Sequence, residues 1–208
     1  MIITISGPSS TGKTSLIENL KKHQEYLESL VQMPVVFGNE SVREVVSSQY
    51  ELKSLQDIFK DQEESLKLQF KVAEYNKSLY CSIIKDNHCL YIFDRGPLDN
   101  LIYTLLCFNN CSSDLMLKYA NDFSNYCALN QWLSENIDLI LLTKPDDAVL
   151  SPEDDGFRPD LFSLLRCVET ELFKLVFRGL KVVDLPSDHN DRLVCFFSEV
   201  TKLARNNK

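Results

Sequence analysis

The sequence of 208 residues contains no long apolar run. Its apolar stretches, such as Leu139 to Leu142, are far shorter than the roughly 20 residues that a helix needs to cross a bilayer. The segment that follows Met1 also lacks the basic start and the small-residue cleavage site of a secretory signal. These absences predict a protein without a membrane span that is located in the cytoplasm.

The sequence also contains no Cys-x-x-Cys pair, and its three histidines show no spacing typical of metal ligands. The seven cysteines are an odd number and are spread from Cys81 to Cys195. This pattern fits neither a disulfide framework nor a protein zinc centre. We expect reduced, mostly buried thiols instead.

Positive charge is scarce. The chain has 22 Lys and Arg residues against 30 Asp and Glu residues, which gives a formal net charge of −8. Apart from a short basic cluster at residues 202–208, no stretch compensates for this charge. An acidic chain repels a phosphate backbone, so a nucleic acid partner is disfavoured. A nucleotide bound by backbone amides and a few fixed cations remains compatible with this composition.

Five short apolar, β-rich runs alternate with helical patterns along the chain. Continuous apolar runs of this kind are typical of strands that are buried on both faces of a parallel sheet. Helical spacing is clearest over about residues 55–85 and again over residues 115–135. The runs are Ile2 to Ser6, Pro34 to Phe37, Cys89 to Phe93, Asp138 to Thr143 and Leu180 to Asp184. The alternation predicts one α/β domain over residues 1–208, with a five-stranded parallel sheet between layers of helices.

The first run leads directly into a phosphate-binding motif, Gly-x-x-x-x-Gly-Lys-Thr, and a helical pattern follows it. The glycines allow successive N–H groups to turn inward around a phosphate. We expect Lys13 to bridge the β- and γ-phosphates of ATP and the Thr14 hydroxyl to ligate Mg²⁺. The expected nucleotide-binding residues are Gly7, Ser9, Ser10, Thr11, Gly12, Lys13, Thr14 and Ser15.

The third run ends in Asp94-Arg95-Gly96. A carboxylate at the carboxyl end of a strand that neighbours the P-loop would face both Mg²⁺ and the acceptor. We therefore expect Asp94 to act as a base or a metal ligand, and Arg95 to neutralise charge on the transferred phosphoryl group. A turn in which Asp94 bonds only backbone groups is the structural alternative.

Two further motifs stand in order with these two: Glu40-Ser-Val-Arg43 after the second run and Asp155-Gly156-Phe157-Arg158 after the fourth. With these four motifs the chain resembles the NadR-like P-loop AAA domains, the group of the ribosylnicotinamide kinases, and more distantly the thymidylate and deoxynucleoside kinases. The resemblance covers Ile2 to about Asp184. It implies a three-layer P-loop NTPase fold and a kinase that uses ATP and Mg²⁺ to phosphorylate a small nucleoside-like or nucleotide-like acceptor.

The resemblance also implies roles for residues outside the P-loop. Glu40 would bind or deprotonate the acceptor hydroxyl, and Arg43, one helical turn later, would reach the same pocket. Arg158 would close over the triphosphate from a lid loop at about residues 144–160. The expected catalytic residues are Lys13, Glu40, Asp94, Arg95 and Arg158; the expected acceptor-binding residues are Glu40, Arg43, Asp94 and Asp99; and the expected metal ligands are Thr14 and Asp94. A surface Glu40–Arg43 ion pair and a solvated acidic loop are the structural alternatives.

Two other functions remain open at this point. A nucleotide switch that hydrolyses ATP or GTP slowly is one, because the resemblance extends to proteins proposed to bind GTP. The Asn-Lys-x-Asp motif of GTPases is absent, and residues 143–146 match it only in part. A polynucleotide or modified-base kinase is the other, and the net charge disfavours it. The sequence determines neither the acceptor nor whether the chain forms a homodimer.

Overall fold

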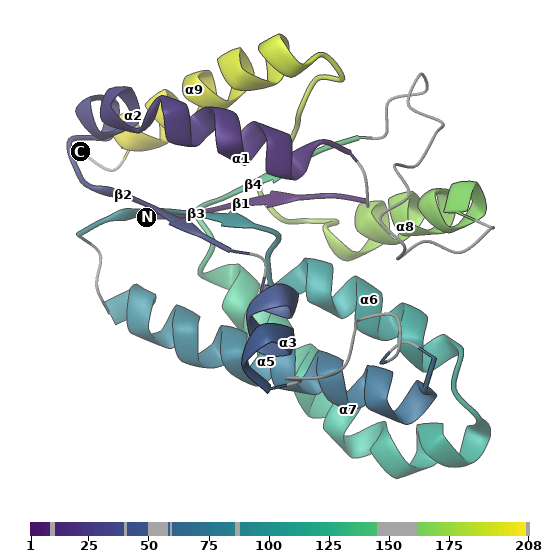
Figure 1. Ribbon diagram of the computed structural model, residues 1–208. Helices are drawn as coiled ribbons and strands as arrows, with labels where there is room; N and C mark the ends of the chain where they lie inside the picture. The colour runs from purple at the N-terminus through teal and green to yellow at the C-terminus, as the bar shows by residue number, and fades with distance from the viewer. Residues whose placement is uncertain are drawn as a thin grey trace.

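The computed structural model describes residues 1–8, 11–39, 41–49, 58, 60–85, 88–144 and 162–206. A five-stranded parallel sheet runs through the middle of the molecule, with the strand order β2-β3-β1-β4-β5 (Figure 1). The strands are β1 (Ile2–Ser6), β2 (Val35–Gly38), β3 (Leu90–Asp94), β4 (Leu139–Leu142) and β5 (Val182–Asp184). Because β1 lies between β3 and β4, the segments that follow these three strands leave the sheet at the same edge.

One face of the sheet is covered by α1 (Lys13–Lys22), α2 (Gln24–Val31) and α9 (His189–Asn206) (Figure 1). Ile3 and Ile5 of β1 point into this layer, where they join Leu16 and Leu20 of α1 and Phe196 of α9 in one buried cluster. Full burial of each such side chain stabilises the fold by roughly 1.5–3 kcal/mol. This packing fixes the position of α1, whose first residue belongs to the P-loop.

The other face is covered by α5 (Gln62–Lys85), α6 (Pro97–Asn109), α7 (Ser113–Glu135) and α8 (Phe162–Val176), with α3 (Ser41–Gln49) packed against α5 (Figure 1). α6 occupies the centre of this layer, because it contacts α5, α7 and α8. It begins directly after β3, with Gly96 as its N-cap and Pro97 in its first turn. Proline is favoured there because its missing N–H needs no partner.

The predicted fold class is confirmed. All five predicted strands are present, and none of their ends differs from the predicted end by more than two residues. The helix expected at residues 115–135 is α7, which starts two residues earlier, where the Ser112 hydroxyl accepts a hydrogen bond from the Leu115 N–H (3.4 Å). The helix expected at residues 55–85 is represented by α5; residues 50–57 and 59 lie outside the described residues.

Two aromatic side chains of α5, Tyr80 and Phe70, pack against neighbouring elements. Tyr80 is buried and stacks on Phe93 of β3, with a distance of 5.2 Å between the ring centroids. Phe70 contacts Tyr119 and Tyr126 of α7. In the described ranges no helix has the length and apolar character that a membrane span requires. The six cysteines with a described environment are free and partly buried.

Candidate functional site

The P-loop leaves β1 through two glycines in left-handed or related backbone conformations. Gly7 has φ 138° and Gly12 has φ 79°, values that L side chains rarely adopt. A Cβ on Gly7 would overlap the Thr143 side chain and lie 2.5 Å from the Thr143 carbonyl oxygen, and one on Gly12 would lie 2.8 Å from the ring of His189. Both positions therefore require glycine. Ser9 and Ser10 of the predicted nucleotide set lie outside the described residues.

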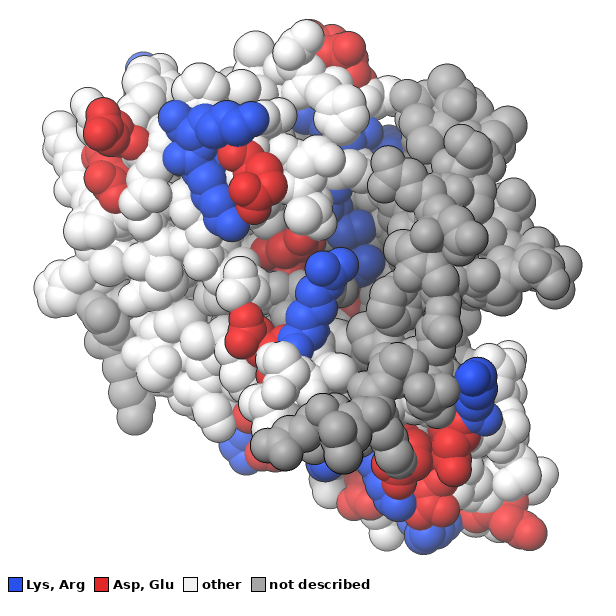
Figure 2. All heavy atoms as spheres, viewed as in Figure 1, with Lys and Arg blue, Asp and Glu red and all other residues white. Residues whose placement is uncertain are grey.

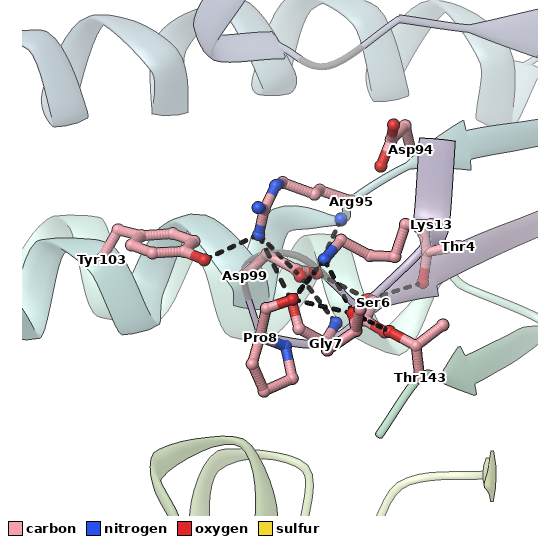
Figure 3. Close-up of polar contacts among 12 residues, drawn as sticks. Thr4, Ser6, Gly7, Pro8, Lys13, Asp94, Arg95, Asp99, Tyr103 and Thr143 are labelled. Atoms are coloured by element: carbon pink, nitrogen blue, oxygen red, sulfur yellow. Dashed lines mark hydrogen bonds and ion pairs between the residues drawn. The ribbon is translucent and has the colours of Figure 1, made fainter. Parts of the chain in front are cut away.

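Lys13 lies inside the loop, and its side chain is buried (Figure 3). Its ammonium donates hydrogen bonds to the carbonyl oxygens of Gly7 (2.9 Å) and Pro8 (2.6 Å) and contacts the Thr11 hydroxyl (3.3 Å). The charge is thus held at the centre of the turn formed by the loop. An anion bound there would meet this ammonium and the N-terminus of α1 together.

Thr14 and Asp94 meet at the mouth of the loop, and the Thr14 hydroxyl donates to Oδ2 of Asp94 (2.9 Å). The pair brings together two hard oxygen ligands from α1 and from the end of β3. A hydroxyl and a carboxylate in this arrangement suit Mg²⁺, which binds proteins through few ligands and keeps several waters. The two predicted metal ligands, Thr14 and Asp94, are therefore adjacent, and their oxygen atoms fit Mg²⁺.

Asp99 lies beneath the P-loop and is only 1% exposed. Its carboxylate accepts hydrogen bonds from the Ser6 hydroxyl (2.6 Å), the Gly7 N–H (3.2 Å) and the Gly96 N–H (2.8 Å). Burial raises the pKa of this carboxyl group, and the nearby Arg95 opposes the shift. The sequence assigned Asp99 to the acceptor; the structure places its carboxylate where it joins β1, the P-loop and the start of α6.

Arg95 extends across the junction between the P-loop and α6 (Figure 3). Its φ of 71° lies in the left-handed region, which costs a non-glycine residue about 1–2 kcal/mol. The guanidinium donates to the Tyr103 hydroxyl (2.8 Å) and the Gly7 carbonyl (3.4 Å), and it lies 3.8 Å from the Asp99 carboxylate. It also lies over the Tyr103 ring, 5.0 Å from its centroid. These contacts hold the arginine in place despite the strained backbone.

Two segments far away in the sequence support the P-loop from its other side. The Thr143 hydroxyl, after β4, donates to the Ser6 carbonyl (3.0 Å) and pairs with the Thr11 hydroxyl (2.6 Å). Arg192 of α9 is buried and donates to the carbonyls of Thr11 (2.5 Å) and Pro186 (2.6 Å). The loop is therefore held from β4 and α9 as well as from α6.

A cleft of about 280 Å³ opens beside the Thr14–Asp94 pair. It is lined by Thr14, Ile17, Glu18, Lys21, Gly38, Asn39, Arg43, Glu44 and Asp94. Arg43 and Asp94 therefore line the same cavity. Glu40, whose pocket Arg43 was expected to reach, lies outside the described residues. Basic and acidic side chains are interspersed around the hollow in the middle of this face (Figure 2).

A second, smaller hollow lies between α3, α5 and α6, on the other side of Arg95. We call it the α5–α6 hollow; it has a volume of about 20 Å³. Its lining consists of Ser41, Val42, Val72, Asn76, Arg95, Gly96, Asp99, Asn100 and Tyr103. Arg95 lines this hollow and also contacts Gly7, so it connects the hollow to the P-loop.

The structure brings most of the described candidate residues together. Gly7, Thr11, Gly12, Lys13, Thr14, Asp94, Arg95 and Asp99 surround one junction. Ser15 is exposed on the first turn of α1. Arg158 and residues 145–160 of the expected lid loop lie outside the described residues.

Sequence reasoning missed Tyr103, Asn100 and Arg192. Tyr103 follows Asp99 by four residues, so it shares the face of α6 that carries Asp99, and this spacing was the available signal. Asn100 and Arg192 gave no comparable signal, because polar residues within amphipathic helices usually lie on the surface.

Comparisons with known proteins agree with this fold. The family model of an AAA domain matches residues 2–192. A structure of deoxyadenosine kinase from M. mycoides with the products dCMP and a flexible dCDP bound has a TM-score of 0.63 at 15% identity, covering 97% of this chain and 100% of that chain. The same enzyme with bound dATP has a TM-score of 0.65 at 16% identity, covering 96% and 99%. No curated protein matches in sequence.

Proposed function

Because this chain belongs to the AAA domain family, we propose that it is a P-loop kinase that moves the γ-phosphoryl group of ATP onto a hydroxyl of a small nucleoside-like or nucleotide-like acceptor. The observation that carries this proposal is the position of Arg95. Its guanidinium contacts the P-loop at Gly7 and also lines the α5–α6 hollow, so it lies between a donor site and a second cavity.

On the donor side, the P-loop amides and Lys13 would bind the β- and γ-phosphates. The Lys13 ammonium would exchange its carbonyl partners for phosphate oxygens as the nucleotide enters. Thr14 and Asp94 would hold Mg²⁺, which supplies charge neutralisation between the β- and γ-phosphates when it is bound. Gly12 allows the loop to pass close to His189 and Arg192, where a Cβ would clash with both side chains.

On the acceptor side, a carboxylate would take the proton of the attacking hydroxyl. The new bond forms between the acceptor oxygen and the γ-phosphorus, and the bond from that phosphorus to the β-phosphate oxygen breaks, so that ADP and the phosphorylated acceptor result. Asp94 and Glu40 are the candidate bases. Arg95 would neutralise the charge that spreads over the transferred group, which is the main catalytic requirement of phosphoryl transfer.

The nature of the acceptor is proposed from the comparisons. The similar solved structures are of a deoxyadenosine kinase, seen with dATP and with the products dCMP and dCDP. For this protein we propose a nucleoside-type acceptor, ATP as the phosphoryl donor, and a location in the cytoplasm. The predicted lid function of Arg158 belongs to the same proposal.

The test is ADP release from ATP and Mg²⁺ in the presence of a panel of nucleosides, deoxynucleoside monophosphates and nicotinamide riboside. One acceptor class should stimulate release strongly over the control without acceptor. Lys13→Ala should lower the stimulated rate by at least about 10²–10³-fold, the usual loss when one preorganised charge donor is removed.

Lys22→Ala is the matched control, because Lys22 is exposed at the end of the same helix and bonds only Asn19 among the contacts described. It should leave the rate unchanged. Slow turnover that ignores every acceptor would favour a nucleotide switch, and full turnover in Lys13→Ala would refute the proposed mechanism.

A further inference from the structure

Arg192, near the start of α9, is a buried cation that the proposed reaction does not use. Its side chain is only 2% exposed, although burying a charge is costly unless the group is well hydrogen-bonded. Its Nε donates to the Pro186 carbonyl (2.6 Å) and its Nη1 to the Thr11 carbonyl (2.5 Å). The guanidinium therefore joins the turn after β5 to the P-loop.

The P-loop partner of Arg192 is the carbonyl of the peptide bond that joins Thr11 to Gly12. The described part of the chain contains no cis peptide bond. In a planar trans peptide, the C=O and the N–H that follows it point in opposite directions. Because the Thr11 carbonyl points at Arg192, the Gly12 N–H points away from α9.

The covalent structure alone does not fix the plane of this peptide. Gly12 has a φ of 79°, and glycine adopts positive and negative φ values about equally well. A peptide that precedes glycine can therefore rotate, as it does between type I and type II turns. The Thr11 hydroxyl bonds the Pro8 carbonyl (2.8 Å) and the Thr143 hydroxyl (2.6 Å), which holds the side chain but not the plane of the next peptide.

The position of the guanidinium is itself set by the core. The residue before Pro186, Leu185, is buried, and its N–H donates to the Leu142 carbonyl of β4 (2.8 Å). On α9, Phe196 is buried in the cluster that joins this helix to α1 and the sheet (Figure 1). The planar fork of an arginine suits two carbonyl acceptors held at fixed positions. Arg192 can therefore hold the P-loop peptide from a rigid base.

We propose that Arg192 is a positioning residue, which holds the Thr11–Gly12 peptide so that the Gly12 N–H faces the β-phosphate of the bound nucleotide. The inference rests on the proposed function in one respect: the P-loop must bind a nucleoside diphosphate or triphosphate. A donor that is aimed before binding needs no reorganisation when the anion arrives. The guanidinium also adds positive charge behind the turn, since Nη1 lies 2.9 Å from the position of a Cβ on Gly12.

The experiment compares the affinities of ADP and AMP, because AMP lacks the β-phosphate. Both are measured as competitors of a fluorescent ADP analogue, so that only the donor site is read. Arg192→Met should weaken ADP binding about tenfold or more, the effect of losing one hydrogen bond to a charged group. AMP binding should change little. An unchanged ADP-to-AMP affinity ratio, or an equal loss for both ligands, would overturn the assignment.

Two further variants separate positioning from a general loss of stability. Arg192→Lys keeps the charge but not the fork that holds both carbonyls, so it should recover part of the ADP affinity. Val200→Ala is the matched control, because Val200 is buried on the same helix, about two turns further on. It should lower the melting temperature and keep the wild-type ratio. A ratio reduced as much by Val200→Ala as by Arg192→Met would refute a role specific to Arg192.

The ³¹P resonances of bound ADP provide a readout that a merely structural role would not move. The β-phosphorus resonance should differ between the wild type and Arg192→Met, and the α-phosphorus resonance should stay in place. Equal shifts of both resonances would contradict an effect directed at the β-phosphate.

The same measurements separate this inference from the proposed function. A wild-type protein that binds ADP through Arg192 but transfers no phosphate would support the positioning role and refute the kinase. Phosphoryl transfer by a wild type whose ADP-to-AMP ratio survives in Arg192→Met would leave the kinase standing and refute the positioning role. A wild type that binds no ADP would refute both.

Discussion

The P-loop and the α5–α6 hollow lie on opposite sides of Arg95 and differ in how their polar groups are paired. Around the P-loop, none of the buried side-chain polar atoms in the described residues lacks a partner. Lys13, Thr143, Asp99 and Arg192 all bond to the loop or to its neighbours. In the helical layer next to the hollow, two carboxamide oxygens remain unpaired.

This difference shows how unequally the two regions are organised. The P-loop is held rigidly by internal hydrogen bonds that a nucleotide partly replaces, so its shape is set before binding. Between α5 and α6, the buried side-chain oxygens of Gln69 and Asn100 have no partner, and each costs the folded protein about 1–3 kcal/mol. The first arrangement favours a precise geometry, whereas the second leaves hydrogen-bond acceptors buried without a partner between two packed helices.

Gly7→Ala should have the largest effect, because it disrupts the packing of the P-loop against Thr143. The new Cβ would overlap the Thr143 side chain and meet the Thr143 carbonyl oxygen at 2.5 Å, at a φ of 138°. Overpacking combined with the unfavourable backbone conformation should lower the free energy of unfolding by about 3 kcal/mol or more and weaken nucleotide binding. Urea denaturation and calorimetry with ADP measure the two effects.

Gly179→Ala is the control, because Gly179 also has a positive φ (88°) but no atom lies within 4 Å of the position that its new Cβ would take. It should cost only the backbone term of about 1–2 kcal/mol. Equal losses in the two variants would show that the contact with Thr143 is not what makes Gly7 necessary.

Tyr103→Phe tests how Arg95 is held between the P-loop and the α5–α6 hollow. The variant keeps the ring beside the Arg95 guanidinium and removes the hydroxyl that accepts its hydrogen bond (2.8 Å). A hydrogen bond to a charged group contributes about 1.5–3 kcal/mol, so kcat should fall about tenfold or more while the KM for ATP changes little. Steady-state kinetics with the acceptor found by the panel provide the measurement.

Tyr26→Phe controls for loss of a hydroxyl, since Tyr26 is exposed on α2, on the opposite face of the sheet. It should have wild-type kinetics. If Tyr103→Phe raised the KM for ATP and left kcat unchanged, Tyr103 would act on the donor side and not through Arg95.

Glu63→Gln should have the smallest effect, and it tests how the helical layer around the hollow is held. Glu63 at the start of α5 accepts hydrogen bonds from Lys118 (2.8 Å) and Tyr119 (2.7 Å) of α7. These bonds, with Lys67, lower its pKa from 4.5 to about 2. A lowered pKa in the folded state means that the contribution to stability is present above pH 4.5 and is lost as the pH falls toward 2.

The wild type should therefore be slightly more stable than Glu63→Gln in urea at pH 7, and the difference should shrink steadily below about pH 4.5. Glu74→Gln, at an exposed position on the same helix, should show no such pH-dependent difference. A gap between wild type and Glu63→Gln that stayed constant down to pH 3 would contradict the role of the ionised carboxylate.

The fold was largely predictable from sequence because its signals are local. Buried parallel strands are continuous apolar runs, and the P-loop has a fixed spacing that places Lys13 and Thr14 at the start of a helix. The position of Asp94 followed from the same logic, since β3 pairs with β1.

The hydrogen bonds around the site were not predictable from sequence, because they join segments far apart in the chain. The Ser6 hydroxyl bonds Asp99 across 93 positions, and the Thr11 carbonyl accepts from Arg192 across 181. Gln69 and Asn100 look like surface residues of amphipathic helices until α5 packs on α6 and buries them. No local sequence pattern indicates which polar residue of a helix will face another helix.

One peptide oxygen receives cations from both sides of the site. The Gly7 carbonyl accepts from Lys13 at 2.9 Å and from Arg95 at 3.4 Å. In the proposed mechanism Lys13 would turn to a nucleotide phosphate, and this oxygen would lose its nearer donor, so that Arg95 could approach it more closely. The arrival of the nucleotide would then set the position of Arg95 before the acceptor enters. The reaction should accordingly show ordered addition, with the nucleotide binding first and ADP leaving last.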